Sequence, residues 1–292
     1  MTVEILTSST TWTCPNGVTS VDVECFGAGG GGQVTNGTNG GSGGAGGAYS
    51  SKTNITVVPG EVYQVGVGAS GRGGQASAEV GGDGGDSFFK NYATVLAKGG
   101  HGAISASTSP IGGLASEGIG DIKHSGGDGG EGNSTSEGGG GGGGAGDKQD
   151  GGIGGNAGVG TPGAAGVGGL DEGGDGGAGG NSTNGGDGSN FGGGGGGAAN
   201  STTTGGDGGR GEVRLTYTNA PAEQESFIFR EDNGSETTAT SIAAQNTNIS
   251  RSRDTNTRLR LLLPSSGAAS SSRFQLESRH KNSGEDWQVV VA

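Results

Sequence analysis

The sequence predicts a mainly β protein: an antiparallel β-sandwich with an inserted polyglycine-II helix bundle, followed by a small C-terminal β-sandwich. Three observations lead to this prediction. Short runs near both ends of the chain alternate apolar and polar residues, as half-buried strands do. Glycine makes up 76 of the 292 residues, against roughly 7% in ordinary proteins. Apolar residues are only 27% of the chain, too few for a conventional core of this length.

The first predicted domain covers residues 1–218. Its predicted strands are short runs rich in β-branched and aromatic residues: 21–26, 55–58, 63–67, 88–89, 94–97 and 212–217. The last run must return to the N-terminal strands, because residues 101–211 contain a single aromatic, Phe191, and cannot build a core for it. We expect most of the aromatic core among Trp12, Phe26, Tyr49, Tyr63, Phe88, Phe89 and Tyr92.

Cys14 and Cys25 flank a predicted turn at 16–20, so two interpretations are open. The two residues could face each other across a hairpin as a disulfide. The interpretation that we favour is two small buried hydrophobic side chains, which is how free cysteines usually behave.

The insertion at about 101–211 consists of glycine blocks separated by short polar spacers. Gly151, Gly154, Gly160, Gly163, Gly166 and Gly169 keep a three-residue rhythm. Three residues per turn is the period of the polyproline-II helix, which has no internal hydrogen bonds. Glycine lets such helices approach closely enough to bond to one another, which predicts a polyglycine-II bundle with the spacers as end loops. A flexible linker and an irregular glycine-rich sheet are the alternatives.

Residues 219–292 have ordinary composition and predict a small antiparallel β-sandwich that serves as a docking module. Its predicted strands are 227–229, 258–261, 273–277 and 287–291. Arginines gather in this part of the chain, and the candidates for docking are Arg251, Arg253, Arg258 and Arg260. They would either meet an acidic partner or form a solvated strand face with intersubunit ion pairs.

The sequence predicts no enzyme, no cofactor and no metal site. His101, His124 and His280 are too scattered for a catalytic set, and no phosphate-binding loop or nucleophile motif occurs. The net charge of −13 repels nucleic acid and anionic membranes, and no apolar run approaches the ~18 residues of a membrane span. Residues 81–89 fit a calcium-binding nonapeptide once, but that motif acts in tandem, so a glycine turn before a strand is the favoured interpretation.

Five aspartates share a Gly-Gly-Asp-Gly context: Asp83, Asp128, Asp175, Asp187 and Asp207. We expect them to cap or solvate the ends of the bundle. A weak cation or amine site is the alternative.

The order of motifs over about 1–218 resembles the glycine-rich domain of bacteriophage tail and fibre proteins. The resemblance rests on Trp12–Val18, on Phe26-Gly27-Ala28 before a glycine run, on Val58–Tyr63, on Gly84–Phe88 and on the closing Gly208–Tyr217. Cysteine at positions 14 and 25 departs from the usual apolar residue. The glycine blocks and spacers are also similar to the receptor-binding adhesins at the fibre tips of T-even-like phages, which implies a polyglycine-II bundle that presents variable loops to host receptors.

The resemblance implies a non-enzymatic bacteriophage structural protein, either a tail fibre or a receptor-binding adhesin. Its partners would be other virion proteins and a host surface glycan or outer-membrane protein, and it would form a homo-oligomer, as a trimer or a helical assembly. The absence of a secretory signal at the N-terminus predicts synthesis in the host cytoplasm, release by lysis and a place in the virion. The alternative is a purely structural head fibre, capsid decoration or filament subunit, and ice binding by a flat glycine-rich face is weaker still.

The candidate receptor-binding loops are the spacers at 103–125, 133–137, 148–150, 181–184 and 200–204, because loops on a rigid scaffold commonly carry function. Hydroxyl and amide side chains there can bond to sugar hydroxyls. The candidate residues are Ser105, Ser107, Thr108, Asn133, Ser134, Thr135, Lys148, Gln149, Asn181, Thr183, Asn200, Thr202 and Thr203.

Overall fold

The computed structural model describes residues 1–75, 78–218, 226–233, 238–251, 256–262, 277–278 and 288–289. The chain forms two compact units. The first is Met1–Cys14 with Val18–Asn219, and the second is Pro15–Gly17 with Ala220–Ala292.

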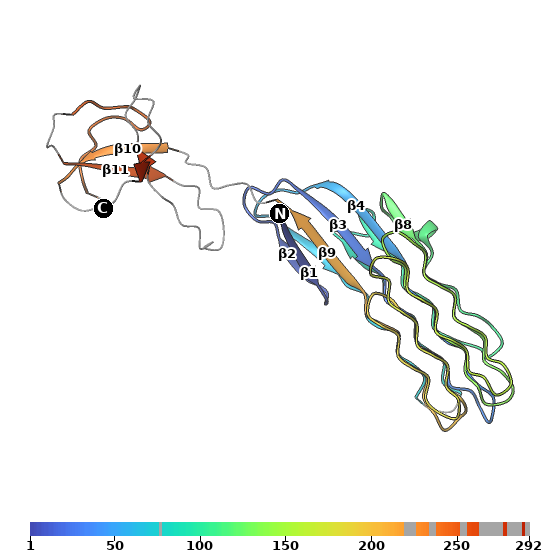
Figure 1. The fold of residues 1–292 in the computed structure, drawn as a ribbon. Helices are drawn as coiled ribbons and strands as arrows, with labels where there is room; N and C mark the ends of the chain where they lie inside the picture. Colours follow the sequence, from blue (N-terminus) through green and yellow to red (C-terminus); the bar gives the residue numbers. More distant parts are fainter. Residues whose placement is uncertain are drawn as a thin grey trace. The chain divides into compact units, whose positions relative to one another are not determined.

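The larger sheet of the first unit has five antiparallel strands in the order β1-β9-β3-β4-β8 (Figure 1). Their bounds are β1 Thr2–Leu6, β3 Ser20–Phe26, β4 Tyr49–Thr56, β8 Ile122–His124 and β9 Glu212–Tyr217. Strand β9 lies between β1 and β3, so the prediction that the run at 212–217 returns to the N-terminal strands is confirmed. The run predicted at 55–58 is only the end of β4, which stops at Thr56.

The smaller sheet has four strands in the order β2-β5-β6-β7. These are β2 Thr10–Thr13, β5 Val62–Gly66, β6 Ser87–Phe89 and β7 Val95–Ala97. A single turn of 3-10 helix, η1, covers Ala115–Glu117. Within the described residues no helix is long and apolar enough to cross a membrane.

The apolar faces of the two sheets share one core. Trp12 is at its centre, with ring centroids 6.1 Å from Tyr63, 5.9 Å from Phe89 and 5.6 Å from Tyr217. Phe26 and Tyr49 are also buried, in a second cluster. Phe88 and Tyr92, which we also expected in the core, lie outside it, and Tyr92 is 58% exposed. Alternate residues of a strand point to opposite faces, and Phe89 takes the inward position of β6. Phe88 therefore lies on the other face, where Tyr92 stacks on it.

Cys14 and Cys25 are both buried free thiols, so the favoured interpretation is confirmed and the disulfide is wrong. The Cys14 thiol donates to the Val18 carbonyl at 3.3 Å. Burial raises the pKa of both thiols above the ordinary value, which keeps them protonated and unreactive.

The chain between successive strands forms extended glycine segments that hydrogen-bond to one another through their backbones. Every third residue of a segment bonds to the same neighbouring segment. In segment 138–146, residues 138, 141 and 144 donate to the segment at 174–180. Residues 139, 142 and 145 donate to the segment at 41–47, and residues 140, 143 and 146 to residues 149–155. Successive N–H groups therefore point in three directions, and the carbonyls accept from three further segments.

Four segments are completely buried and each has six hydrogen-bonded neighbours: 27–34, 40–48, 138–146 and 192–198. Ten outer segments surround these four in a closed ring within the described part of the first unit: 68–74, 79–85, 98–103, 111–113, 126–132, 151–157, 163–169, 173–180, 185–189 and 205–209. Two of the inner segments, 27–34 and 40–48, precede residue 101. The glycine region therefore begins well before the insertion that the sequence suggested.

Glycine is required because the backbones approach too closely for a side chain. A Cβ added at Gly141 would lie 2.0 Å from the carbonyl oxygen of Gly194, and one at Gly44 would lie 2.2 Å from that of Gly30. Neither distance is compatible with a carbon–oxygen contact. The three-residue rhythm follows, since Gly163, Gly166 and Gly169 all donate to the same inner segment.

Aspartate and asparagine side chains bridge neighbouring outer segments. In each bridge an Oδ1 atom accepts a backbone N–H from the adjacent segment, at 2.7–3.0 Å. The acceptors are Asp83, Asp86, Asp128, Asp150, Asn156, Asp175, Asn184, Asp187 and Asp207. The expectation that the Gly-Gly-Asp-Gly aspartates cap segment ends needs correction: Asp83, for example, lies mid-segment, with hydrogen-bonded glycines on both sides.

The second unit contains two antiparallel strand pairs. Strand β10 (Ser226–Glu231) pairs with β11 (Thr257–Leu262), and β12 (Glu277–Ser278) pairs with β13 (Gln288–Val289). The strands expected at 227–229 and 258–261 are present. The rest of the runs at 273–277 and 287–291 lies outside the described residues.

Gly141→Ala tests the close packing of the inner segments. The Cβ would force backbones apart, so we expect a loss of about 3 kcal/mol in the free energy of unfolding. Gly158→Ala is the matched control, because its Cβ would meet nothing nearer than Thr161 at 3.9 Å. Denaturant titration of both variants is the measurement. Equal stability of the two variants would contradict the packing described here.

Asp128→Ala and Asp128→Asn test the bridges between outer segments. Alanine removes the acceptor for the Gly112 N–H, whereas asparagine keeps an Oδ1 in the same place. We expect alanine to cost about 1 kcal/mol and asparagine to be near neutral. Thermal unfolding measures both. If asparagine is as harmful as alanine, the charge and not the hydrogen bond is what matters at this position.

Candidate functional site

The turns that link the glycine segments divide between two ends of the first unit. Segments alternate in direction, so successive turns lie alternately far from the β sheets and close to them (Figure 1). The far turns that are described throughout are 35–39, 104–109, 133–137, 158–161, 181–184 and 200–204, and we call them together the end surface. The near turns are 147–150, 170–172 and 190–191.

Hydrogen bonds join the turns of the end surface to one another. The Ser136 hydroxyl donates to the Thr38 carbonyl at 2.6 Å, and the Ser201 N–H donates to the Gly37 carbonyl at 3.0 Å. The turn at 104–109 is held by the inner segment 40–48, where the Ser42 hydroxyl donates to the Ser105 carbonyl at 2.7 Å. The turns therefore form one connected surface and are not independent flexible loops.

Residues 35–39 lie at the centre of the end surface, because they link two inner segments, 27–34 and 40–48. Asn36, Thr38 and Asn39 are exposed there. The sequence analysis missed this turn because it precedes residue 101. Its Thr-Asn-Gly-Thr-Asn composition between glycine runs is the signal that could have found it.

Most of the predicted receptor-binding residues are brought together on the end surface. Those that come from its turns are Ser105, Ser107, Thr108, Asn133, Ser134, Thr135, Asn181, Thr183, Asn200, Thr202 and Thr203. Lys148 and Gln149 are not among them, because their turn lies at the near end. Lys148 pairs there with Asp171, whose carboxylate raises the pKa of the lysine ammonium.

The asparagines of these turns hold the turns in shape. Asn133 Oδ1 accepts the Thr135 and Glu137 N–H groups, both at 3.0 Å, and its Nδ2 donates to the Gly158 carbonyl at 2.8 Å. Asn200 Oδ1 likewise accepts from the Thr202 N–H at 2.9 Å. Such side chains are committed to the fold, whereas Ser107, Thr108 and Ser134 are exposed; Thr183 is exposed too, but its hydroxyl accepts the Asn181 N–H at 3.2 Å.

Glu137 is the one charged side chain within the six turns, and it is only 6% exposed. Its carboxylate accepts from the Thr135 hydroxyl at 2.7 Å and from the Gly160 N–H at 3.0 Å. The Thr135 hydroxyl is the main cause of a lowered pKa for this carboxyl, followed by Asn133. Glu137 thus links two turns as a buried, ionised carboxylate.

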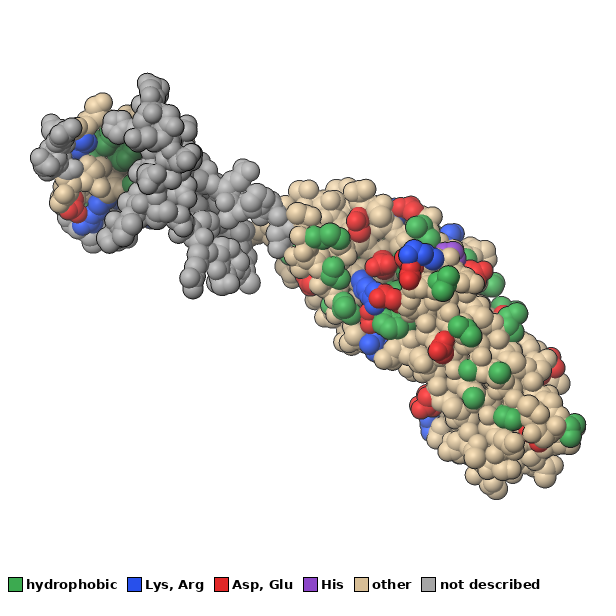
Figure 2. Space-filling view, viewed as in Figure 1, with side chains coloured by type: hydrophobic (Ala, Val, Ile, Leu, Met, Phe, Trp, Pro, Cys, Tyr) green, Lys and Arg blue, Asp and Glu red, His purple; other side chains and the backbone are tan. Residues whose placement is uncertain are grey.

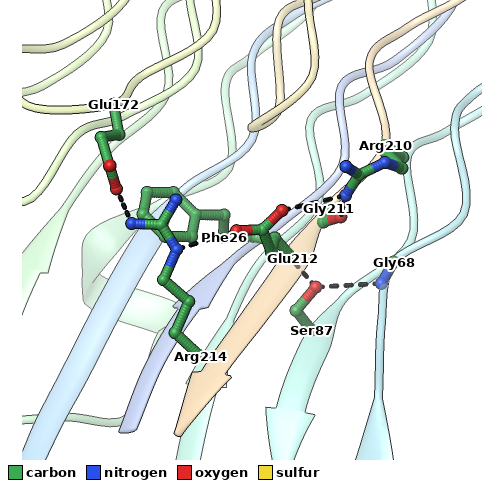
Figure 3. Close-up of polar contacts among 8 residues, drawn as sticks. All are labelled: Phe26, Gly68, Ser87, Glu172, Arg210, Gly211, Glu212 and Arg214. Carbon is green, nitrogen blue, oxygen red and sulfur yellow. Dashed lines mark hydrogen bonds and ion pairs between the residues drawn. The ribbon is translucent and has the colours of Figure 1, made fainter. Parts of the chain in front are cut away.

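A junction at the other end fixes the glycine segments to the sheets (Figure 3). The Ser87 hydroxyl donates to the Phe26 carbonyl at 2.6 Å and accepts from the Gly68 N–H at 2.9 Å. Glu212 bonds to Arg210 at 3.2 Å and to Arg214 Nε at 2.8 Å. Burial still raises the pKa of the Glu212 carboxyl, with Arg210 acting in the opposite direction.

Two of the near turns, 170–172 and 190–191, dock on this junction. The Arg214 guanidinium pairs with Glu172 and lies 5.3 Å from the ring centroids of both Phe26 and Phe191. Glu172 and Phe191 both have positive φ, which non-glycine residues adopt at a cost of roughly 1–2 kcal/mol. Phe191, the single aromatic of residues 101–211, thus anchors a turn to the sheet.

The acidic side chains of the nonapeptide, for which a glycine turn was the favoured interpretation, bond within the chain. In the nonapeptide at 81–89, Asp83 accepts from the Gly102 N–H and Asp86 pairs with Lys98 at 2.6 Å, so both carboxylates are used within the chain. Within the described residues no group of three or more His, Cys, Asp or Glu side chains is placed to hold a metal ion.

Of the docking arginines, Arg251 and Arg258 pair with Glu231 and Asp232 of their own unit, and Arg260 is exposed on β11. Arg253 lies outside the described residues.

Asn133→Ala and Ser134→Ala separate turn-forming side chains from presented ones. Asn133→Ala removes three hydrogen bonds, so we expect a loss of about 2 kcal/mol in the free energy of unfolding. Ser134→Ala should change stability by no more than ~0.5 kcal/mol, because its side chain is exposed. Denaturant unfolding compares them. A stable Asn133→Ala variant would show that the turn holds its shape without the asparagine.

Comparison with known proteins gives one family. A family model described as a glycine-rich domain matches residues 5–218. No curated protein matches the chain.

Proposed function

Because the chain belongs to the glycine-rich domain family over residues 5–218, we propose that it is a non-enzymatic bacteriophage structural protein, a tail-fibre or receptor-binding adhesin. It presents the end surface to a host surface glycan or protein. The observation that carries the proposal is the collection of six hydroxyl- and amide-rich turns at one end of a closely bonded scaffold, remote from the sheets.

The scaffold itself we assign as a polyglycine-II bundle. Packed threefold helices are expected to have three properties, which the segments share. Their N–H groups point in three directions in turn, each inner segment has six neighbours, and neighbouring carbonyls occupy the places where Cβ atoms would be. Such a scaffold needs no hydrophobic core. It can therefore project turns away from the sheets with a chain that is only 27% apolar.

In this proposal the protein is part of a virion, made in the host cytoplasm and released by lysis. The second unit docks to other virion proteins. The assembly is a trimer or a helical homo-oligomer, which would place several end surfaces side by side and multiply weak contacts.

A second candidate function is a purely structural decoration or filament subunit. The observation in its favour is β1, an edge strand of the larger sheet that exposes Val3 at 55% and Ile5 at 56%. An apolar edge without lysine or proline is a surface that can pair with another chain.

The double variant Thr38→Ala/Ser134→Ala tests the adhesin. It removes two exposed hydroxyls from the middle of the end surface and leaves the turn-forming asparagines intact. We expect binding of the labelled protein to a panel of bacterial strains to fall roughly tenfold, the value of one or two hydrogen bonds. Flow cytometry on intact cells is the measurement.

Lys148→Ala/Gln149→Ala is the matched control, because it removes two exposed side chains from the near end. Its binding should equal that of the parent chain. Equal binding by both double variants would contradict the end surface as the binding site. A parent chain that binds no strain but polymerises through β1 would favour the second candidate.

A further inference from the structure

The end surface has a single ionisable side chain, although the chain as a whole carries −13. No lysine or arginine occurs in its six turns, and the buried Glu137 is their single acid. Behind the turns, acidic side chains are exposed on the outer segments, among them Asp187 and Asp207. On the face shown in Figure 2, charged side chains gather mainly over the sheets and the glycine region is mostly tan. A ligand therefore meets neutral groups, most of them polar, with Ile104 and Val159 exposed among them and negative charge behind them.

The chemistry of the turns is unlike that of a protein-binding surface. Protein interfaces rely on buried Trp, Tyr, Met and Arg side chains. None of these residue types occurs in the six turns, which carry mainly serine, threonine and asparagine, with Ile104 and Val159 exposed among them. Hydroxyl and amide groups both donate and accept hydrogen bonds, which matches the hydroxyls of a saccharide.

A hollow of about 400 Å³ opens beside two of the turns. Its polar lining is Gln75, Asn184, Thr204, Asp187 and Asp207. The turns are fixed around it, because the Thr204 N–H donates to Asn184 Oδ1 at 3.0 Å and the Asp207 N–H donates to Asp187 Oδ1 at 2.9 Å. Carboxylates accept from sugar hydroxyls and repel the acidic groups of a charged sugar.

We infer that the end surface, with this hollow at its edge, selects an uncharged, hydroxyl-rich polysaccharide and excludes acidic ones. The inference rests on the proposed adhesin function and narrows its ligand. Since no aromatic ring lies in the six turns to stack on a sugar, each sugar residue is held mainly by hydrogen bonds. Binding therefore needs a polymer that spans several turns, and single sugars bind weakly.

The test uses the full chain and a strain to which it binds. Surface polysaccharide from that strain is separated into neutral and acidic fractions, and each fraction competes with intact cells for the labelled protein. We expect the neutral fraction to compete. Its half-inhibiting concentration should change by less than about twofold between about 20 mM and about 500 mM NaCl, because no ion pair is involved.

A charged derivative of the same polymer measures how much electrostatic repulsion contributes to the exclusion of acidic polysaccharides. The neutral fraction, lightly carboxymethylated, should compete roughly tenfold less well. Asp187→Asn/Asp207→Asn should recover most of that loss, because asparagine keeps each Oδ1 acceptor and removes both charges. Asp128→Asn, on a different outer segment, is the control and should recover nothing. Equal thermal stability of all variants shows that the scaffold is intact.

The outcomes distinguish a failure of the inferred ligand class from a failure of the proposed adhesin function. Competition by the acidic fraction alone, or no recovery with Asp187→Asn/Asp207→Asn, overturns the inference and leaves the adhesin in place. Binding lost after protease treatment of the cells and kept after periodate also overturns it, in favour of a protein receptor. Absence of binding to every strain is the result that overturns the proposed function itself.

Discussion

The rest of the structure depends on how closely the glycine backbones approach one another. At Gly141 a neighbouring carbonyl oxygen occupies the place of a side chain, 2.0 Å from where a Cβ would be. This approach lets each inner segment exchange hydrogen bonds with six others, so buried polar backbone is satisfied without strands or helices. Inner side chains occur at restricted positions: Ser42, Ala45 and Ala48 repeat every third residue, on one side of their segment.

This lattice of bonded glycine segments ends at its ten outer segments, and their position explains much of the amino-acid composition of the glycine region. Some N–H groups of an outer segment point away from the other segments and find no backbone carbonyl. Asp and Asn side chains of the adjacent outer segment accept these N–H groups instead. Acidity is therefore partly structural. At the near end the boundary meets the sheets, where Arg214 holds turns with positive φ against Phe26. The charges described in the glycine region thus lie along its sides and at the junction, and the six far turns contain one acid, the buried Glu137.

Much of this architecture is readable from the sequence, and the failures have physical causes. The strands at 212–217 and 63–67 follow from alternation, and the glycine rhythm follows because residues three apart face the same neighbour. Lateral neighbours leave no such trace, so the burial of 27–34 inside the glycine region was not predicted. The spacers looked equivalent in sequence. Because segments alternate in direction, every second spacer lies at the opposite end, which separates Lys148 from the candidates of the end surface.

The same geometry divides the chain into positions under different constraints. Inside the lattice the choice of residue is limited by carbonyl oxygens of other segments, so one substitution disturbs several neighbours at once. In the end turns the constraint is local: Asn133 and Asn200 fix their turns, while exposed neighbours such as Ser134 contact nothing that the scaffold requires. A surface of this kind can change its hydroxyls and amides freely as long as its asparagines and glycines stay. That freedom, held on a rigid base, is what recognition of varied polar ligands demands.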